Sequence, residues 1–243
     1  MLEKILDCER ALFLQLNGAH SPFADQFMWL FSGLTVWIVA VISFFVILLY
    51  ANRQRWREAL LIIAAIALVF TLCDQFSSGL CKPFFARLRP THHPNFMNDV
   101  ITVFDYRGSQ YGFISSHAAN GFGFVTLTSL IFRNKLYSIM LFLWAITSAY
   151  SRIYLGVHFI SDIIPGIITG LLGGLIVFKL FIFVHKKLFV GKNGKNGKTS
   201  FTESPYPHNG LTVILSLLIA TVIMMAITGS LYAFRIIPAI TIQ

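Results

Sequence analysis

Residues 27–50 read FMWLFSGLTVWIVAVISFFVILLY, and no side chain in this stretch carries a charge. An α-helix needs about 20 consecutive apolar residues to cross the hydrocarbon core of a bilayer. The run is continuously apolar rather than alternating, and it is longer than a strand of a membrane β-barrel. The stretch therefore predicts a transmembrane helix and an all-α fold.

Further apolar runs of similar length follow along the chain, at about 58–80, 114–132, 136–154, 160–182 and 211–234. Hydrophobic residues make up 56% of the sequence and charged residues only 12%, with a mean hydropathy of +0.72. A soluble domain usually carries about 25% charged residues. We therefore predict a polytopic transmembrane helix bundle of about six spans, which makes the bilayer itself a partner.

The N-terminal segment differs from these runs because charged and apolar residues alternate along it. A signal peptide would have an uninterrupted apolar core, whereas mixed residues of this kind are typical of an amphipathic helix at the membrane interface. A second polar segment, containing the run GKNGKNGK at 191–198, predicts a flexible linker. The predicted organisation is an interfacial amphipathic helix over 1–20, a core of five transmembrane helices over 27–184, a flexible cytoplasmic linker over 185–209, and an additional C-terminal transmembrane helix over 210–243.

Positive charge is concentrated in three loops, 51–57, 133–135 and 185–209, which alternating spans place on one side of the membrane. Lys and Arg favour the cytoplasmic side, so this rule accounts for much of the net charge of +9 without a nucleic-acid partner. Residues 81–113 and 151–158 then lie on the opposite side. We expect a multi-pass protein of the bacterial inner membrane whose second face is periplasmic or exterior.

Five cations interrupt this charge bias on the expected outer face, namely Lys82, Arg87, Arg89, Arg107 and Arg152, and three of them are candidates for one anion site. Lys82 closes the second span, Arg89 follows seven residues later before Pro90, and Arg152 ends the fourth span. An ammonium group combined with planar guanidinium groups suits a tetrahedral oxyanion such as phosphate. The alternative is that each cation is an interfacial anchor that reaches toward headgroups. Three of them opposite the positive loops favour a shared anion site.

His158 and Asp162 lie four residues apart, so on a helix they share one face. The carboxylate can then orient the imidazole through one ring nitrogen and leave the other free to attack. A purely structural His–Asp pair is the alternative interpretation.

The run Ser115-Ser116-His117 begins the third predicted span. A helix N-terminus offers free N–H groups and a positive dipole end, both of which attract phosphate. His117 would then be placed for proton transfer near neutral pH. Without the other two patterns, simple N-capping would explain this run.

In this order and at these spacings, the patterns Lys82-x6-Arg89-Pro90, Ser115-x-His117 and Ser151-Arg152-x5-His158-x3-Asp162 resemble the motifs of the type 2 phosphatidic acid phosphatase superfamily, which includes vanadium haloperoxidases. The motifs cover residues 82–162, and the hydrophobic layout of about 27–182 is also similar to that family. Ile114 and Ser116 stand where the family usually has Pro and Gly.

The resemblance implies metal-independent hydrolysis of a phosphate ester or anhydride on a membrane lipid, without a cofactor. His158 would form a phosphohistidine, Asp162 would orient it, and His117 would protonate the leaving group. The groups that would hold the phosphoryl oxygens are Lys82, Arg89, Ser115, Ser116 and Arg152. No pattern predicts a metal site or the oligomeric state.

Several substrates and functions remain open at this point. Undecaprenyl pyrophosphate and lipid A phosphate are favoured by analogy with the family. Phosphatidylglycerophosphate and phosphatidic acid are alternatives, and so is a non-enzymatic lipid-phosphate binding or transport protein. A haloperoxidase is disfavoured because its relatives are typically soluble. A transporter should show repeated halves or helices broken near mid-bilayer, which the sequence does not suggest.

Two further patterns predict helix packing. Gly166, Gly170 and Gly174 recur every four residues and form a small-residue face, which we expect to pack within the chain rather than across a dimer. Asp74 shares a helical face with Lys82, which indicates a structural ion pair.

Overall fold

The computed structural model describes residues 2–189 and 208–241, and within them regular structure is helical apart from one isolated bridge between Leu88 and Tyr111. This confirms the all-α prediction. Short helical turns at Arg53–Arg55, Gln75–Cys81 and Pro90–His92 join longer helices. These helices are α1 (Leu2–Asn17), α2 (Pro22–Ser32), α3 (Leu34–Ala51), α4 (Trp56–Asp74), α5 (Lys82–Phe85), α6 (Ser116–Phe132), α7 (Lys135–Tyr154), α8 (Ile160–Phe189) and α9 (His208–Ala233).

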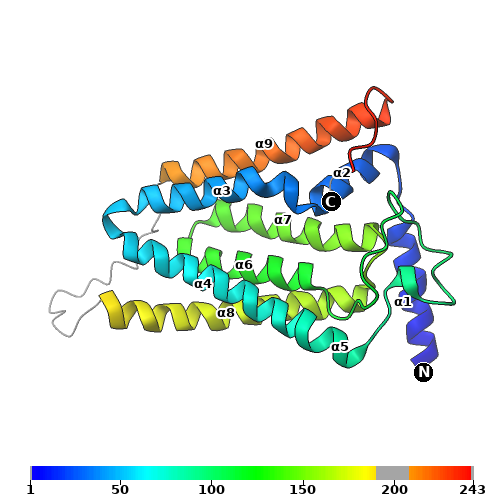
Figure 1. Ribbon diagram of the computed structural model, residues 1–243, viewed down its shortest axis with the longest axis horizontal. Helices are drawn as coiled ribbons and strands as arrows, with labels where there is room; N and C mark the ends of the chain where they lie inside the picture. The colour runs from blue at the N-terminus through cyan, green and yellow to red at the C-terminus, as the bar shows by residue number, and fades with distance from the viewer. Residues whose placement is uncertain (1, 190–207, 242–243) are drawn as a thin grey trace.

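The described helices form an elongated membrane bundle (Figure 1). Four continuous helical stretches are long and apolar enough to cross a bilayer, and they are Trp56–Phe85, Lys135–Tyr154, Ile160–Phe189 and Ile214–Ala233. The number becomes five if α2 and α3 count as one span, although they are bent by 47°. The span predicted at 27–50 is therefore a broken helix. The break falls at Gly33, which is extended and ends α2.

The span predicted at 114–132 is α6, whose 17 residues cover roughly 25 Å at 1.5 Å per residue. That is shorter than a typical hydrocarbon core of about 30 Å. Most of its side chains are nevertheless buried by the surrounding helices, including Phe122, Val125 and Leu127. α6 packs against α4, α7 and α8 and is the central helix of the bundle.

The glycine face of α8 packs against α6, as the sequence predicted. A Cβ atom at Gly170 would lie 2.5 Å from the carbonyl oxygen of Ala119, and one at Gly166 would lie 2.7 Å from that of Ser115. Only glycine permits so close an approach. Because Ser115 and α6 begin the central motif, this packing also fixes the distance between two of the three motifs.

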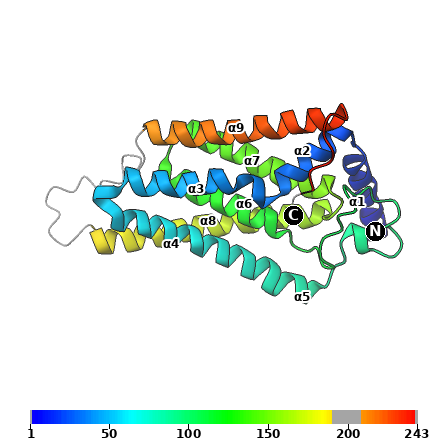
Figure 2. The ribbon, with the colours of Figure 1, turned by 45° about the horizontal axis from the view of Figure 1, so that its top comes forward.

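The two ends of the bundle have different compositions (Figures 1 and 2). The α3–α4 and α6–α7 connections and the last turn of α8 lie at one end, with Arg53, Arg133 and Lys186 among their residues. At the other end, α1 lies across the bundle beside the long segment between α5 and α6. Both loops that carry motifs belong to this second end.

The helices α1 and α9 lie outside the segment predicted as the core. α1 covers most of the segment expected to be an interfacial helix, and α9 lies along α2 and α3 (Figure 2). α8 remains helical as far as Phe189, so the first residues assigned to a flexible linker are part of a helix. The rest of that linker, including 191–198, lies outside the described residues.

Candidate active site

Two motif segments meet through the backbone at the start of α6 and α8. The N–H of Ser115 donates to the carbonyl oxygen of Asp162 at 3.0 Å. The Ser115 hydroxyl caps α6 by accepting from the N–H of Ala118 at 3.4 Å. The capping interpretation of Ser115 is therefore correct, and the same residue lies beside the His–Asp motif.

His158 and Asp162 form the expected pair in a buried environment. His158 Nδ1 lies 3.4 Å from Asp162 Oδ2, and the two side chains are 1% and 0% exposed. This separation is slightly longer than a hydrogen bond, and catalytic contacts of this kind commonly tighten when substrate binds. The carboxylate approaches Nδ1, which leaves Nε2 as the nitrogen available for attack.

Asp162 is held by partners that the sequence did not indicate. Its Oδ1 accepts from Arg87 at 2.8 Å, and its Oδ2 accepts from the backbone N–H of Phe159 at 3.0 Å. A carboxylate that is fully buried needs such donors to remain charged at an acceptable free energy. Arg87 lies between Lys82 and Arg89 in the sequence, and this position inside a motif was the one sequence feature that could have indicated its place in the site.

Lys82 reaches the second motif directly. Its Nζ donates to the Ser116 hydroxyl at 3.2 Å and to the Ser78 hydroxyl at 3.1 Å. Ser78 in turn donates to Asp74 Oδ1 at 3.2 Å. The direct ion pair predicted between Asp74 and Lys82 is therefore not formed, because the Ser78 hydroxyl lies between the two side chains and bonds to both.

The guanidinium groups of Arg89 and Arg152 are held by surrounding loops and by α2. Arg89 donates to the Tyr111 carbonyl oxygen at 3.1 Å and to the Ser109 hydroxyl at 3.0 Å. Arg152 contacts the Ser32 hydroxyl and donates to the Tyr106 hydroxyl at 3.2 Å. The Nε of Arg152 is buried and has no hydrogen-bond partner in the described part of the chain. That donor is suited to an incoming anion.

The electrostatic environment keeps His158 neutral. Burial lowers its pKa well below the ordinary value, and the charges of Arg89, Arg152 and Lys82 lower it further. Burial also lowers the pKa of Arg89, to about 10, so this guanidinium is still charged at neutral pH. The ring is therefore neutral beside three cations, an arrangement that suits an anionic ligand.

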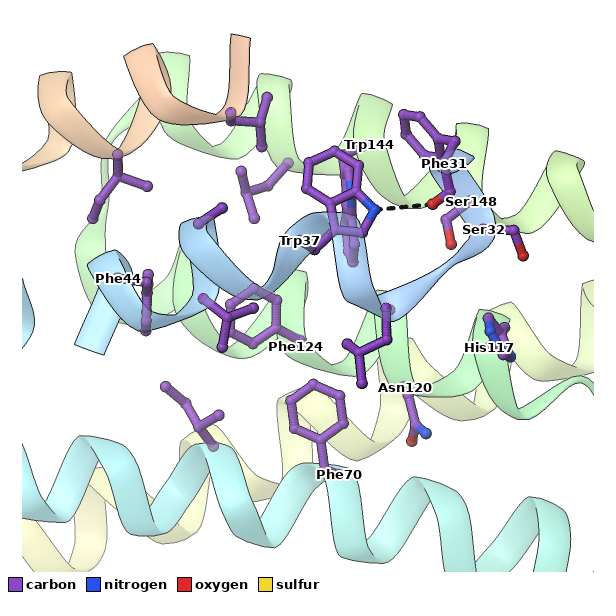
Figure 3. A pocket seen from close by; sticks show the side chains of 18 of the residues that line it. Phe31, Ser32, Trp37, Phe44, Phe70, His117, Asn120, Phe124, Trp144 and Ser148 are labelled. Atoms are coloured by element: carbon purple, nitrogen blue, oxygen red, sulfur yellow. Dashed lines mark hydrogen bonds between the residues drawn. The ribbon is translucent and has the colours of Figure 1, made fainter. Parts of the chain in front are cut away.

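His117 borders both this cluster and a large apolar cavity. The positive charges of Arg152, Arg89 and Lys82 all act on its ring. The cavity has a volume of about 450 Å³ and extends between α2, α3, α4, α6, α7 and α9. Figure 3 shows His117 and Asn120 at one end of the cavity and Phe70, Phe124 and Trp37 along it. One end of the cavity is therefore polar and adjoins the motif residues.

Gly112 is a further site residue that the sequence did not single out. A Cβ atom at this position would lie 2.9 Å from Asp162 Oδ2 and 3.6 Å from His158 Nδ1. The loop backbone therefore packs directly on the His–Asp pair. No spacing rule connects a glycine in this loop to residues about 50 positions later, so only the fold reveals it.

The predicted set of site residues is thus brought to one end of the bundle. In the described residues, no group of three or more His, Cys, Asp or Glu side chains has an arrangement that could hold a metal ion. The absence of a metal requirement remains a prediction for experiment.

The chain is similar in sequence to several bacterial phosphatases. The chain is 46% identical over 188 residues to a lipid A 4′-phosphatase of Porphyromonas gingivalis, which covers 76% of this chain and 78% of the relative. It is 39% identical to a lipid A 4′-phosphatase of Bacteroides thetaiotaomicron, over 77% of this chain and 81% of that protein. A more distant relative is Escherichia coli YbjG, provisionally described as an undecaprenyl-diphosphatase, with 26% identity over 68% of this chain and 80% of that protein.

Two solved structures have a similar fold. LpxE of Aquifex aeolicus matches 70% of this chain and 93% of its own, with 28% identity and a TM-score of 0.50. A transmembrane phosphatidylglycerolphosphate phosphatase of the PAP2 type from Bacillus subtilis matches 76% and 89%, with 22% identity and a TM-score of 0.58. The model of the PAP2 superfamily matches residues 63–186, which include all three motifs. The chain therefore belongs to the PAP2 superfamily and is a bacterial membrane lipid phosphatase.

Proposed function

We propose that this phosphatase removes a phosphate group from lipid A by forming a phosphohistidine at His158. The observation that carries the chemical part of the proposal is the buried His158–Asp162 pair, with 3.4 Å between Nδ1 and Oδ2, beneath three cations. The lipid A part is supported by the two relatives described as lipid A 4′-phosphatases.

In the first proposed step, the Nε2 lone pair of His158 attacks phosphorus. The phosphorus–oxygen bond to the lipid breaks, its electron pair stays on the leaving oxygen, and His117 donates a proton to that oxygen. Lys82, Arg89 and Arg152 stabilise the charge on the phosphoryl oxygens. The product at this stage is a phosphohistidine and a lipid alcohol.

In the second proposed step, His117 accepts a proton from a water molecule that attacks the phosphohistidine. The phosphorus–nitrogen bond breaks, its electron pair returns to Nε2, and inorganic phosphate leaves. Asp162 stabilises the ring in both steps by accepting from the Nδ1 side. The positive end of α6 lies beside the phosphate throughout, and the backbone N–H of Ser116 donates to a phosphoryl oxygen.

The apolar cavity supports a lipid substrate. It is lined almost entirely by aliphatic and aromatic side chains, and its polar residues include His117, Asn120 and Ser148. An acyl chain placed in this cavity would leave its headgroup near His117. Water-soluble phosphates would gain nothing from such a cavity, because they have no apolar surface to bury.

A pyrophosphate of a polyprenyl lipid is the second candidate substrate. It is supported by the more distant similarity to YbjG, and the same cations could hold its terminal phosphate.

We also propose that the motif-bearing end of the bundle faces the periplasm, because the other end carries the arginine- and lysine-rich connections.

The purified protein should release phosphate from lipid A, and His158→Ala should reduce the rate by at least about 10³-fold while leaving thermal unfolding in detergent unchanged. Activity should persist in EDTA, and vanadate should inhibit it. Acid-labile, base-stable label from a ³²P-labelled substrate should appear on the wild type. A label on serine, or near-normal activity of His158→Ala, would contradict the nucleophile assignment. Loss of activity in EDTA that Mg²⁺ restores would show a metal requirement.

A further inference from the structure

The N-terminal helix α1 is fixed against the motif-bearing end of the bundle by one face. Glu9, Phe13 and Asn17 are four residues apart and lie on this face. Phe13 is fully buried, with ring centroids 5.7 Å from Phe96 and 5.3 Å from Phe159. The Asn17 amide donates to the Tyr154 carbonyl oxygen at 2.9 Å. These contacts determine where Glu9 lies.

Glu9 is joined to the proposed nucleophile by a continuous series of polar contacts. Its Oε2 accepts from Arg87 at 2.9 Å, and Arg87 donates to Asp162 Oδ1 at 2.8 Å. The other oxygen, Oε1, accepts from the backbone N–H of Ser161 at 2.9 Å and also contacts the Ser161 hydroxyl. Glu9 therefore binds both the arginine that supports Asp162 and the residue immediately before Asp162.

The burial of these groups gives the series its importance. Asp162 is fully buried, and the side chains of Arg87 and Glu9 are also largely shielded from solvent, with 28% and 15% of their surface exposed. The Arg87 guanidinium also lies over the Phe159 ring, 4.8 Å from its centroid. A planar guanidinium can bind two carboxylates at once, and each contact restricts its rotation. With Glu9 neutral, Asp162 would be the only carboxylate among the described residues in an ion pair with Arg87.

We propose that Glu9 and Arg87 are positioning residues for phosphoryl transfer. Glu9, supplied by the N-terminal helix, fixes Arg87, and Arg87 fixes Asp162 so that Oδ2 faces the Nδ1 of His158. This inference rests on the proposed role of His158 as nucleophile. It makes α1 part of the active enzyme, in addition to its expected contact with the membrane surface.

The test uses Glu9→Gln, which keeps the side-chain size and removes the charge, and Arg87→Gln. The matched control is Asp7→Asn on the same helix, where the side chain is 73% exposed and is 3.8 Å from Arg10. We expect Glu9→Gln to lower kcat about tenfold with KM within about twofold, as for other groups that orient a catalytic residue. Asp7→Asn should behave as wild type.

A double variant separates positioning from simple anchoring of the helix. If Glu9 acts through Arg87, the variant Glu9→Gln/Arg87→Gln should be no slower than Arg87→Gln alone. Arg87→Lys, which keeps the charge but not the fork, should recover part of the rate and provides the same comparison if Arg87→Gln does not fold. All rates are measured per folded, monodisperse protein, with release of phosphate from lipid A as the assay.

Three outcomes would overturn the inference while the proposed function stands: a kcat of Glu9→Gln equal to that of Asp7→Asn, additive losses in the double variant, or a change in KM alone. An inactive wild type under the same conditions would overturn the inference together with the proposed function. If the wild type turns over lipid A and His158→Ala does not, the proposed function stands and the inference about Glu9 is judged separately.

Discussion

At the scale of single residues, the charge around His158 determines the pH range in which its ring can attack. Burial and then the charge of Arg89 are the largest causes of its lowered pKa. Arg89→Gln removes one positive charge, so protonation of the ring costs less and the pKa of His158 rises. Because the neutral ring is the reactive form, the acid limb of kcat/KM against pH should move to higher pH.

This pH prediction has a matched control on the same loop. Arg107 is exposed and is not among the groups that shift His158, so Arg107→Gln should leave the acid limb where it is in wild type. The same substrate is used for all three proteins, which keeps the ionisation of its phosphate constant. A limb that stays in place in Arg89→Gln, whatever the height of the plateau, would contradict the electrostatic account.

The sequence could suggest candidate site residues where their spacing is local. His158 and Asp162 are only four positions apart, although His158 lies in the turn just before α8 and not, as the sequence predicted, on the same helix as Asp162. Ser115 and His117 lie at the start of α6. Glu9 and Arg87 are 78 positions apart, so their pairing depends on how α1 packs and no local pattern reveals it. The same reason explains why Gly112 was missed.

At the scale of helices, the close contact of α8 with α6 should be sensitive to one methyl group. Gly170→Ala would place a Cβ 2.5 Å from the Ala119 carbonyl oxygen and 2.8 Å from the Gly123 nitrogen. Overpacking of this kind costs about 1–3 kcal/mol. We expect a lower unfolding temperature in detergent and a lower kcat, since α6 carries Ser115 and His117. Ile168→Ala, which alters an exposed position on the same helix, is the control. Equal unfolding temperatures for the two variants would contradict this packing role.

The cavity between helices provides a second prediction at this scale. Ala40 of α3 lines it, so Ala40→Phe should fill part of the space expected to hold an acyl chain. We expect kcat/KM for lipid A to fall about tenfold, because roughly 1.4 kcal/mol of apolar contact is lost. The rate with a short, water-soluble phosphate ester should be unchanged. A parallel loss with both substrates would instead indicate damage to the catalytic residues.

Helix existence was predictable from hydrophobic runs, whereas helix breaks were not. Residues 27–50 read as one span, but Gly33 adopts an extended conformation and divides them into α2 and α3. Ser32, beside this break, contacts Arg152, so the bend brings α2 into the site. Uniform hydrophobicity contains no information about such a bend, because both halves remain apolar.

At the scale of the whole molecule, alternating spans and loop charge predicted which segments share an end. The structure places the motif loops together at one end and the α3–α4 and α6–α7 connections at the other (Figure 1). Alternation succeeds here because it depends only on the number and order of the helices and needs no knowledge of side-chain contacts. Loop charge adds the prediction of which end is cytoplasmic. Which end faces the periplasm is a separate prediction that needs a labelling experiment.

That experiment introduces single cysteines after Cys8, Cys73 and Cys81 have been replaced. Asn98 is exposed in the loop at the motif end, so Asn98→Cys should react with a membrane-impermeant maleimide in intact spheroplasts. Asn193 lies outside the described residues, in the predicted cytoplasmic linker, and Asn193→Cys should react only after lysis. Phosphate release from lipid A confirms that each variant is folded. The reverse labelling pattern would place the site in the cytoplasm. It would then require a substrate available on that face, because a phosphorylated headgroup does not cross the hydrocarbon core at an appreciable rate.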